Sequence, residues 1–461
     1  MAGSILGTRV LRTEDPELLL GNAKYVGDLD LGDQLRMVFV RSEMAHAVIT
    51  GIDTSAAQSA PGVVAVWTAD DLGLPPFQGM ATVHADFARP PLATDRVRFV
   101  GECIVAVIAD TVTHAQDAAD MVVVDYEPLP TAVTMDEAVA EDAPLLFEPH
   151  GDNVALTNID PVNSEIFGDA DVIVRGRYVN QRIAVAPMEP HGAASAIAED
   201  GRLLVYGSTQ MPHLLHRLLA GALGTSTDDI KVVVPLVGGG FGGKAGVYPE
   251  QVVVAAAAKR LQRPIVWAST RSEDMLALSH SRGQIQYVEL GCKRDGTFTG
   301  LRVRLLGDGG AYPGIGAYLP AGTRRMSNGT YAFSGIQFDL VVAATNTTPM
   351  GAYRGAGRPE ATALLERAVD QAAIELRIDP IELRKRNMLG NDVFPFTTLT
   401  GITYDSGAYD TPLDAAARFA GYDELRREQA ERRERGDRNL LGIGVSMYVE
   451  ITAGGGTSEY A

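Results

Sequence analysis

The stretch KVVVPLVGGGFGGKAGVYPEQVVVAAAAK, residues 231–259, decides how this sequence is interpreted. An apolar, β-rich segment runs into six glycines, and an alanine-rich helical pattern follows from Pro249. Proline suits the first turn of a helix, so we expect the helix to begin there. A strand, a glycine turn and a helix in this order are the form of a loop that holds a phosphate.

Two nucleotide-binding patterns fit this loop in part. Residues 238, 240 and 243 satisfy G-x-G-x-x-G, and residues 238–244 satisfy G-x-x-x-x-G-K-[ST] except for the final hydroxyl. Ala245 stands where a triphosphate site has the hydroxyl that binds magnesium. A dinucleotide site needs an acidic residue at the end of the next strand, and none occurs between residue 259 and Glu273. A glycine turn with a purely structural role stays open as well.

Composition narrows the class of protein. The 461 residues are enough for about three domains. The net charge of -18 argues against a nucleic-acid partner, which requires clustered basic side chains. The N-terminus lacks the apolar run of a signal peptide, and no later run has the length of a membrane span, so we expect a cytoplasmic protein. Cys103 and Cys292 are too few for an iron–sulfur cluster, which takes four cysteines, and are expected to be buried core thiols.

Strand and helix patterns alternate along the chain, which predicts an α+β protein. The first region ends near the proline-rich EPLPTAV, and a boundary is expected between Pro128 and Asn153. The second region contains strands, a hairpin turn at Asp295-Gly296 and an amphipathic helix from Pro359. A charged helix, DELRREQAERRERGDR, then precedes a final predicted strand, GIGVSMYVEITAGGG.

Three separated motifs carry a family resemblance: STQ at residues 208–210, GGGFGGK at 238–244 and AYRGAGRPE at 352–360. Together they resemble the molybdenum-binding large subunit of the xanthine dehydrogenase, aldehyde oxidase and aerobic carbon monoxide dehydrogenase family. GNAKYVGDLDL at residues 21–31 is similar to the opening of that family, so the resemblance covers essentially the whole chain. It implies an α/β hammerhead domain over residues 1–135, a first molybdenum-cofactor domain over 150–395 and the beginning of a second over 405–461.

The resemblance also implies a cofactor site. Gln210 of STQ is expected to hydrogen-bond an oxo ligand of molybdenum. The backbone at Gly239, Gly240, Phe241 and Gly242 is expected to lie against the metal and its pterin, because a backbone without Cβ atoms lets N–H groups approach an anionic ligand closely.

Further residues are implied by the same resemblance. Arg354 of AYRGAGR is expected to face the substrate, where a rigid guanidinium can stabilise developing negative charge. Arg386 is expected next to the molybdenum centre, although the basic RKR around it is also typical of a solvated helix end. Ala245 and Met388 are expected in the substrate pocket.

Departures from the family pattern bear on the substrate. Purine-oxidising members have an acid where Ala245 stands and an aromatic wall where Met388 stands, and carbon monoxide dehydrogenases have a cysteine in the region of Gly355. Purines, and carbon monoxide with its copper, are therefore disfavoured. An aldehyde or an N-heterocycle remains as the expected substrate, hydroxylated with water as the oxygen source.

The implied cofactor is molybdenum-molybdopterin, with the cytosine dinucleotide form as one option, while FAD and [2Fe-2S] clusters are expected on separate partner subunits. A further chain is expected to supply the C-terminal half and the glutamate that acts as general base, because no residue here matches its motif. A non-catalytic assembly or scaffold half-subunit and an NAD-binding dehydrogenase are the alternative functions. The E-x-H of MEPHG, Glu189 and His191, is interpreted as a turn without a catalytic role.

Overall fold

The computed structural model describes residues 7–451, and the chain divides into two compact units. Unit 1 comprises Met1–Thr131, Ala184–Ser279 and Asn346–Pro349, whereas unit 2 comprises Ala132–Ile183, His280–Thr345 and Met350–Ala461. Both units are therefore assembled from segments that are far apart in the sequence.

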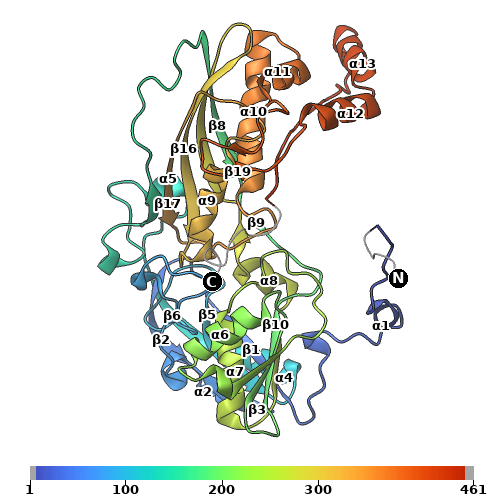
Figure 1. Ribbon diagram of the computed structural model, residues 1–461. Helices are drawn as coiled ribbons and strands as arrows, with labels where there is room; N and C mark the ends of the chain where they lie inside the picture. The colour runs from blue at the N-terminus through green and yellow to red at the C-terminus, as the bar shows by residue number, and fades with distance from the viewer. Residues whose placement is uncertain (1–6, 452–461) are drawn as a thin grey trace. The chain divides into compact units, whose positions relative to one another are not determined.

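Unit 1 is built on a seven-stranded mixed sheet with the order β12-β11-β10-β13-β1-β5-β3 (Figure 1). Its strands are β1 (Leu35–Arg41), β3 (Val63–Trp67), β5 (Cys103–Ala109), β10 (Gly192–Ile197), β11 (Leu203–Gly207), β12 (Ile230–Val233) and β13 (Ile265–Ala268). Strands β1 and β13 pair in parallel, with Leu35 opposite Ile265. This pairing joins N-terminal strands to strands from the middle of the chain in one sheet.

The centre of this sheet is buried on both faces. Every residue of β5, CIVAVIA, is buried, which explains its unbroken apolar sequence. The side chains of β5 are divided between two hydrophobic clusters, one with α7 (Pro249–Leu261) and the other with α4 (Val112–Ala119), and they alternate between them from Val105 onward. Small alanines on α7 let this helix pack closely on β10.

Smaller elements complete unit 1. A three-stranded sheet has the order β4-β2-β6, from β2 (Ala47–Asp53), β4 (Arg96–Val97) and β6 (Val123–Pro128). The remaining helices are α1 (Asp15–Leu19), α2 (Ser55–Gln58), α3 (Ala69–Leu72), α6 (Pro212–Ala222) and α8 (Arg271–Ala277), with 3-10 turns at Val26–Asp28, Ala85–Phe87 and Thr227–Asp229.

Unit 2 is built on a five-stranded sheet with the order β7-β17-β16-β15-β8, and α10 packs on β15 and β8 (Figure 1). Its strands are β7 (Val154–Asn158), β8 (Val172–Asn180), β15 (Gln284–Cys292), β16 (Phe298–Gly310) and β17 (Gly335–Ala344). The helices are α5 (Met135–Ala138), α9 (Ile315–Met326), α10 (Arg358–Leu376), α11 (Pro380–Asn387), α12 (Asp410–Ala420) and α13 (Tyr422–Glu434), with a 3-10 turn at Glu148–His150.

Two short ladders add to these sheets, β9 (Ile183–Ala184) with β14 (His280–Ser281), and β18 (Phe396–Thr397) with β19 (Thr403–Tyr404). In the part of the chain that the structure describes, no helix is long and apolar enough to cross a membrane.

Several sequence expectations agree with these elements. Helix α7 begins at Pro249, α10 has Pro359 in its first turn, and Gly296 has a positive φ in the turn that joins β15 to β16. Cys103 and Cys292 are free, buried and on strands, as expected.

The final predicted strand is wrong within the described residues. Residues 442–451 form no strand, although their exposure alternates from one residue to the next. Side chains satisfy parts of this backbone instead, because Arg384 donates to the carbonyl of Val445 and the N–H of Met447 donates to Glu366. A strand requires a neighbouring backbone, and this segment has none among residues 7–451. Residues 452–456 of the predicted strand lie outside the described residues.

Candidate functional site

The glycine loop lies in unit 1 between β12 and α7. Gly239, Phe241 and Gly242 all have positive φ, at 96°, 51° and 106°. Glycine adopts this conformation readily, whereas Phe241 does so at a cost that the surrounding contacts must offset. The ring of Phe241 is 39% exposed. The loop is therefore a defined, strained turn that presents one aromatic ring at the surface.

Close contacts explain two further glycines. A Cβ on Gly238 would lie 2.4 Å from the Cβ of Glu189, and a Cβ on Gly240 would lie 2.6 Å from Oε1 of Gln210. Carbon atoms do not approach other heavy atoms this closely without a shift of the neighbour. The absence of side chains thus lets the loop lie directly against both of these residues.

Gln210 is attached to this loop at two points. Its side-chain Oε1 accepts a hydrogen bond from the Gly242 N–H at 2.8 Å, and its backbone N–H donates to the Lys244 carbonyl at 3.1 Å. Because a backbone N–H can only donate, the amide oxygen of Gln210 must face Gly242. The amide NH₂ group is then left as a donor, and it has no partner among the described residues.

The loop chemistry fits an anionic cofactor. Within residues 7–451 the N–H groups of Gly239 and Gly240 form no hydrogen bond. Together with the NH₂ group of Gln210, these two N–H groups are several hydrogen-bond donors in one place. Gly239 and Gly240 carry no Cβ, so a ligand can approach their backbone closely. Such clusters of N–H groups bind anionic oxygen or sulfur ligands.

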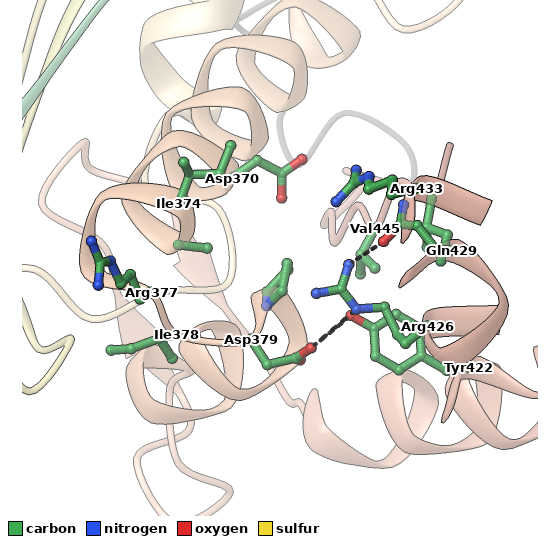
Figure 2. Close-up of a pocket in the computed structure, with 13 residues that line it drawn as sticks. Asp370, Ile374, Arg377, Ile378, Asp379, Tyr422, Arg426, Gln429, Arg433 and Val445 are labelled. Atoms are coloured by element: carbon green, nitrogen blue, oxygen red, sulfur yellow. Dashed lines mark hydrogen bonds and ion pairs between the residues drawn. The ribbon is translucent and has the colours of Figure 1, made fainter. Parts of the chain in front are cut away.

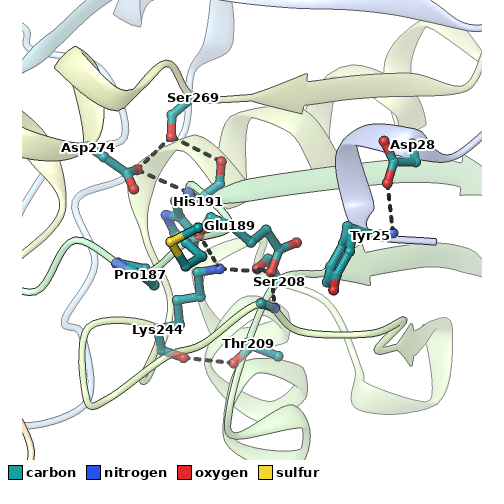
Figure 3. A network of polar contacts seen from close by, with 12 residues as sticks. Tyr25, Asp28, Pro187, Glu189, His191, Ser208, Thr209, Lys244, Ser269 and Asp274 are labelled. Atoms are coloured by element: carbon teal, nitrogen blue, oxygen red, sulfur yellow. Dashed lines mark hydrogen bonds and ion pairs between the residues drawn. The ribbon is translucent and has the colours of Figure 1, made fainter. Parts of the chain in front are cut away.

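A network of polar contacts lies beside the loop (Figure 3). The side chain of Lys244 is fully buried, and its Nζ donates to Oε2 of Glu189 at 2.9 Å and to the Glu189 carbonyl at 2.8 Å. The same Oε2 also accepts from the Ser208 hydroxyl at 2.9 Å and from the Gly238 N–H at 2.8 Å. Three donors, two from the two ends of the loop and one from the STQ motif, therefore converge on one carboxylate oxygen.

Burial controls the protonation of the neighbouring groups. Burial lowers the pKa of Lys244 and outweighs the opposing effect of Glu189. Burial also lowers the pKa of His191 to about 4, although nearby carboxylates act in the opposite direction. His191 is thus neutral near pH 7, and its Nε2 lies 3.2 Å from the Gln251 amide nitrogen. Glu189 and His191 occupy a buried network, which the sequence analysis took for a simple turn.

The second predicted motif, AYRGAGR, lies in unit 2 ahead of α10. Gly355, Ala356 and Gly357 have consecutive positive φ values of 107°, 44° and 96°. A Cβ on Gly357 would lie 2.5 Å from the carbonyl of Leu319, so α9 packs directly against this turn. The motif is therefore a second tight turn that only small residues can form.

Arg282 holds this turn in place. It forms a buried ion pair with Glu360 at 3.1 Å, and its Nη2 donates to the Arg354 carbonyl at 2.9 Å. Its guanidinium also lies over the ring of Tyr353, 5.1 Å from the centroid. The Arg354 side chain is exposed. The backbone that carries Arg354 is thus fixed by a second arginine that the sequence analysis did not single out.

The two remaining predicted residues lie at the end of α11. Arg386 is exposed and donates to the carbonyl of Asp295 in the β15–β16 turn, while Met388 forms an isolated bridge with Tyr331. Arg384 is the buried arginine of this helix, paired with Glu366 at 2.9 Å. The roles proposed for Arg386 and Met388 stay predictions.

The predicted residues fall into two groups. Those in unit 1 are Gln210, Gly239, Gly240, Phe241, Gly242 and Ala245, and the structure brings all of these together around the glycine loop. Those in unit 2 are Arg354, Arg386 and Met388.

Unit 2 also contains a pocket of about 640 Å³ (Figure 2). It is lined by α10, α11, α13 and the segment that follows α13, and its charged residues include Arg377, Arg426, Asp370 and Asp379. Asp379 accepts a hydrogen bond from the Tyr422 hydroxyl at 2.9 Å. None of the predicted site residues lines this pocket.

Comparison with known proteins bears on the glycine loop and its surroundings. Residues 147–388 match the molybdopterin cofactor-binding domain, and residues 20–130 match the a/b hammerhead domain of aldehyde oxidase and xanthine dehydrogenase. The chain belongs to this molybdopterin-binding family. The predicted fold class, a hammerhead followed by a molybdopterin-binding region, is confirmed.

Relatives within the family carry names of molybdenum enzymes. The nicotine 6-hydroxylase large subunit of Paenarthrobacter nicotinovorans is 35% identical over 97% of this chain and 56% of its own length. The structure of quinoline 2-oxidoreductase from Pseudomonas putida 86 superposes with a TM-score of 0.88 and 33% identity, over 93% of this chain and 56% of that chain. This chain thus spans little more than half the length of both relatives.

A third relative differs in length. The nicotinate dehydrogenase large molybdopterin subunit of Eubacterium barkeri is 30% identical over 83% of this chain and 89% of its own length. A family member that matches this chain over most of its own sequence is therefore known.

Proposed function

We propose that this chain is the molybdopterin-binding portion of a molybdenum hydroxylase. The observation that carries the proposal is the glycine loop, where the N–H groups of Gly239 and Gly240 have no partner among the described residues and Gly240 lies against Gln210. An NAD site is not favoured, since the loop has no acidic ribose partner at the end of the following strand, and a triphosphate site lacks its hydroxyl at Ala245.

Each part of the loop has a distinct role in this proposal. The N–H groups of Gly239 and Gly240 and the NH₂ group of Gln210 would hold the anionic cofactor by donating hydrogen bonds to it. Phe241 would shield the bound cofactor from water. When bound, the molybdenum cofactor supplies a two-electron acceptor and a site at which water is activated.

Arg354 is proposed to act on the substrate. Its backbone is fixed by Arg282 and by the turn at Gly355 to Gly357, so the point from which its side chain extends is well defined. A fixed positive charge stabilises negative charge that develops on a substrate atom in the transition state. Arg386 and Met388 are proposed to lie near the metal and the substrate.

We propose an N-heteroaromatic substrate in preference to an aldehyde. The names of all three relatives refer to nitrogen heteroaromatic compounds: nicotine, quinoline and nicotinate. Ala245 offers no carboxylate to grip the several N–H groups of a purine. Hydroxylation would take place at an electron-poor ring carbon, with water as the oxygen source.

The complete enzyme is proposed to be a cytoplasmic complex. Residues 1–135 would be the hammerhead domain, 150–395 the first cofactor domain and 405–461 the beginning of a second. A further chain or chain portion would supply the rest of that domain and the general base, while iron–sulfur and FAD subunits would take the electrons. The pterin could carry a cytosine nucleotide.

The test is co-expression of this chain with its downstream neighbour and with candidate iron–sulfur and FAD subunits. We expect molybdenum by metal analysis, a pterin that fluoresces on oxidation, and ¹⁸O from labelled water in the product of a pyridine or quinoline substrate. Tight NAD binding without molybdenum in an active complex would refute the proposal. Molybdenum binding without turnover on any heterocycle or aldehyde would favour the alternative, a scaffold subunit.

A further inference from the structure

We propose that Glu189 is a positioning residue that sets the shape of the glycine loop and the orientation of Gln210. The link from this shape to cofactor binding rests on the proposed function. Glu189 follows β9 in the chain, about fifty residues before the loop, and none of the three motifs contains it.

Glu189 binds the beginning of the loop through both of its polar ends. Its backbone N–H donates to the Gly238 carbonyl at 3.1 Å, and its Oε2 accepts from the Gly238 N–H at 2.8 Å. One residue therefore engages both backbone groups of the first loop glycine, which fixes the direction in which the chain enters the turn.

Glu189 also binds the end of the loop. The Nζ of Lys244 donates to the carbonyl and to Oε2 of Glu189, at 2.8 and 2.9 Å. Residues 238 and 244 are thereby tied to the same side chain. This clamp fixes the distance between the two ends of the loop, which carries positive φ at three positions between them.

The clamp extends to the motif that contains Gln210. The Ser208 hydroxyl donates to Glu189 Oε2 at 2.9 Å, and the Lys244 carbonyl accepts from Thr209 Oγ1 at 3.0 Å and from the Gln210 N–H at 3.1 Å. These bonds determine how far Gln210 lies from the loop. The single bond from Gly242 to Gln210 Oε1 then sets the direction of its NH₂ group.

The negative charge of Glu189 is essential to this arrangement. The Lys244 side chain is fully buried and needs a charged acceptor, because an unpaired buried ammonium is costly. Glu189 Oε1 is buried without a hydrogen-bond partner among the described residues, so all three side-chain contacts meet at Oε2. Glu189→Gln keeps the shape of the side chain, removes its charge and replaces one carboxylate oxygen with an NH₂ group, which makes it the sharpest test.

The experiment compares the wild-type complex with complexes that contain Glu189→Gln or Lys244→Met. Hydrogen exchange of a peptide covering residues 238–244 reports on the loop without any cofactor. We expect at least tenfold faster exchange in that peptide, with unchanged exchange in β15 and β16. Molybdenum content should fall at least threefold. In the variant complexes that still contain molybdenum, the Mo(V) electron paramagnetic resonance signal should change shape.

Glu366→Gln is the matched control. Glu366 also pairs with a buried arginine, Arg384, at 2.9 Å, but it lies in unit 2, as do its other hydrogen-bond partners Tyr331 and Met447. This variant should lower the melting temperature while loop exchange and molybdenum content per chain stay at wild-type values. If the control moves both readouts as far as Glu189→Gln does, the role of Glu189 is merely structural and the proposal fails.

Two outcomes distinguish a failure of this inference from a failure of the proposed function. Wild-type complex without molybdenum would reject the proposed function, yet loop exchange would still decide the role of Glu189. Loop exchange within twofold of wild type in both variants would overturn the inference whatever the metal content. Should Glu189→Gln not fold, Glu189→Asp keeps the charge on a shorter side chain, and at least threefold faster loop exchange is expected.

Discussion

Arg41 Nη1 lies 2.8 Å from Glu250 Oε1, and this ion pair joins the end of β1 to the first turn of α7. Both side chains are almost fully buried, and Arg41 Nε also lies 3.0 Å from Glu273 Oε1. Burial raises the pKa of Glu250, but Arg41 and other positive charges lower it to about 2. Helix α7, which follows the glycine loop, is thereby linked to an N-terminal strand.

The first prediction concerns stability. Glu250→Gln is expected to lower the free energy of unfolding by about 3 to 5 kcal/mol, because it leaves the buried Arg41 without its full counter-charge. Urea unfolding at pH 7 measures this change. Arg12→Ala removes an exposed pair with Asp15 and should leave stability within error. Equal effects of the two substitutions would contradict the prediction.

The second prediction concerns pH and His191. Its pKa of about 4 in the folded protein lies below its ordinary value of 6.5, since burial disfavours the charged form. The unfolded chain therefore binds a proton first, and the His191 contribution to stability is lost as the pH falls from about 6.5 to about 4. His191→Gln should reduce the loss of unfolding free energy between pH 7 and pH 5 by about 2 kcal/mol.

Urea titrations of both proteins at the two pH values check this difference. The pKa of the neighbouring Glu250 is about 2, so this carboxylate stays ionised at both pH values and does not contribute to the difference. Identical pH dependence of the wild type and the variant would show that His191 does not resist protonation.

The third prediction concerns the closest approach in the loop. Gly240→Ala places a Cβ 2.6 Å from Gln210 Oε1, so the hydrogen bond from Gly242 to Gln210 should break. We expect the complex to lose most of its molybdenum in metal analysis. Gly221→Ala in α6 is the control, since its Cβ meets no atom within 4 Å and alanine favours helix. Wild-type molybdenum content in Gly240→Ala would show that the close approach of Gly240 to Gln210 is not needed to hold the metal.

The fourth prediction concerns Arg354. Arg354→Met should lower kcat by roughly 10²-fold, the scale for the loss of one donor that stabilises transition-state charge. Molybdenum content should stay at its wild-type value. Arg304→Met removes another exposed arginine of unit 2 and should leave turnover unchanged. Unchanged turnover in Arg354→Met would exclude the role, and lost metal would reassign Arg354 to cofactor binding.

Much of the shape of the glycine loop could be predicted from the sequence, because this shape depends on local residue types. Glycines at 239 and 242 mark positive φ, and Pro249 marks the start of α7. The polar clamp could not be predicted in this way. Glu189 meets Lys244 only after folding, and a glutamate before a proline carries no local sign of such a contact.

The fold, too, could be predicted only where it follows from local sequence patterns. Strand β5 and helix α10 follow from their apolar patterns, whereas β10, GAASAI, has the small residues of a loop and was not anticipated. The exposure of residues 442–451 alternates as in a strand, but this segment pairs with no other strand among residues 7–451. The division into two units could not be predicted either. Each unit combines segments that are far apart in the sequence, and patterns along the sequence do not show which distant strands pair.

The parallel pairing of Leu35 with Ile265 has a consequence for biosynthesis. The ribosome makes β1 early but cannot release β13 until more than two hundred further residues have been added. At bacterial and eukaryotic elongation rates of about 5 to 20 residues per second, one edge of β1 waits for roughly 10 to 50 s. An apolar strand edge left open for so long invites pairing with other chains. Folding in the cell is therefore expected to depend on a chaperone that covers the nascent N-terminal region until translation passes β13.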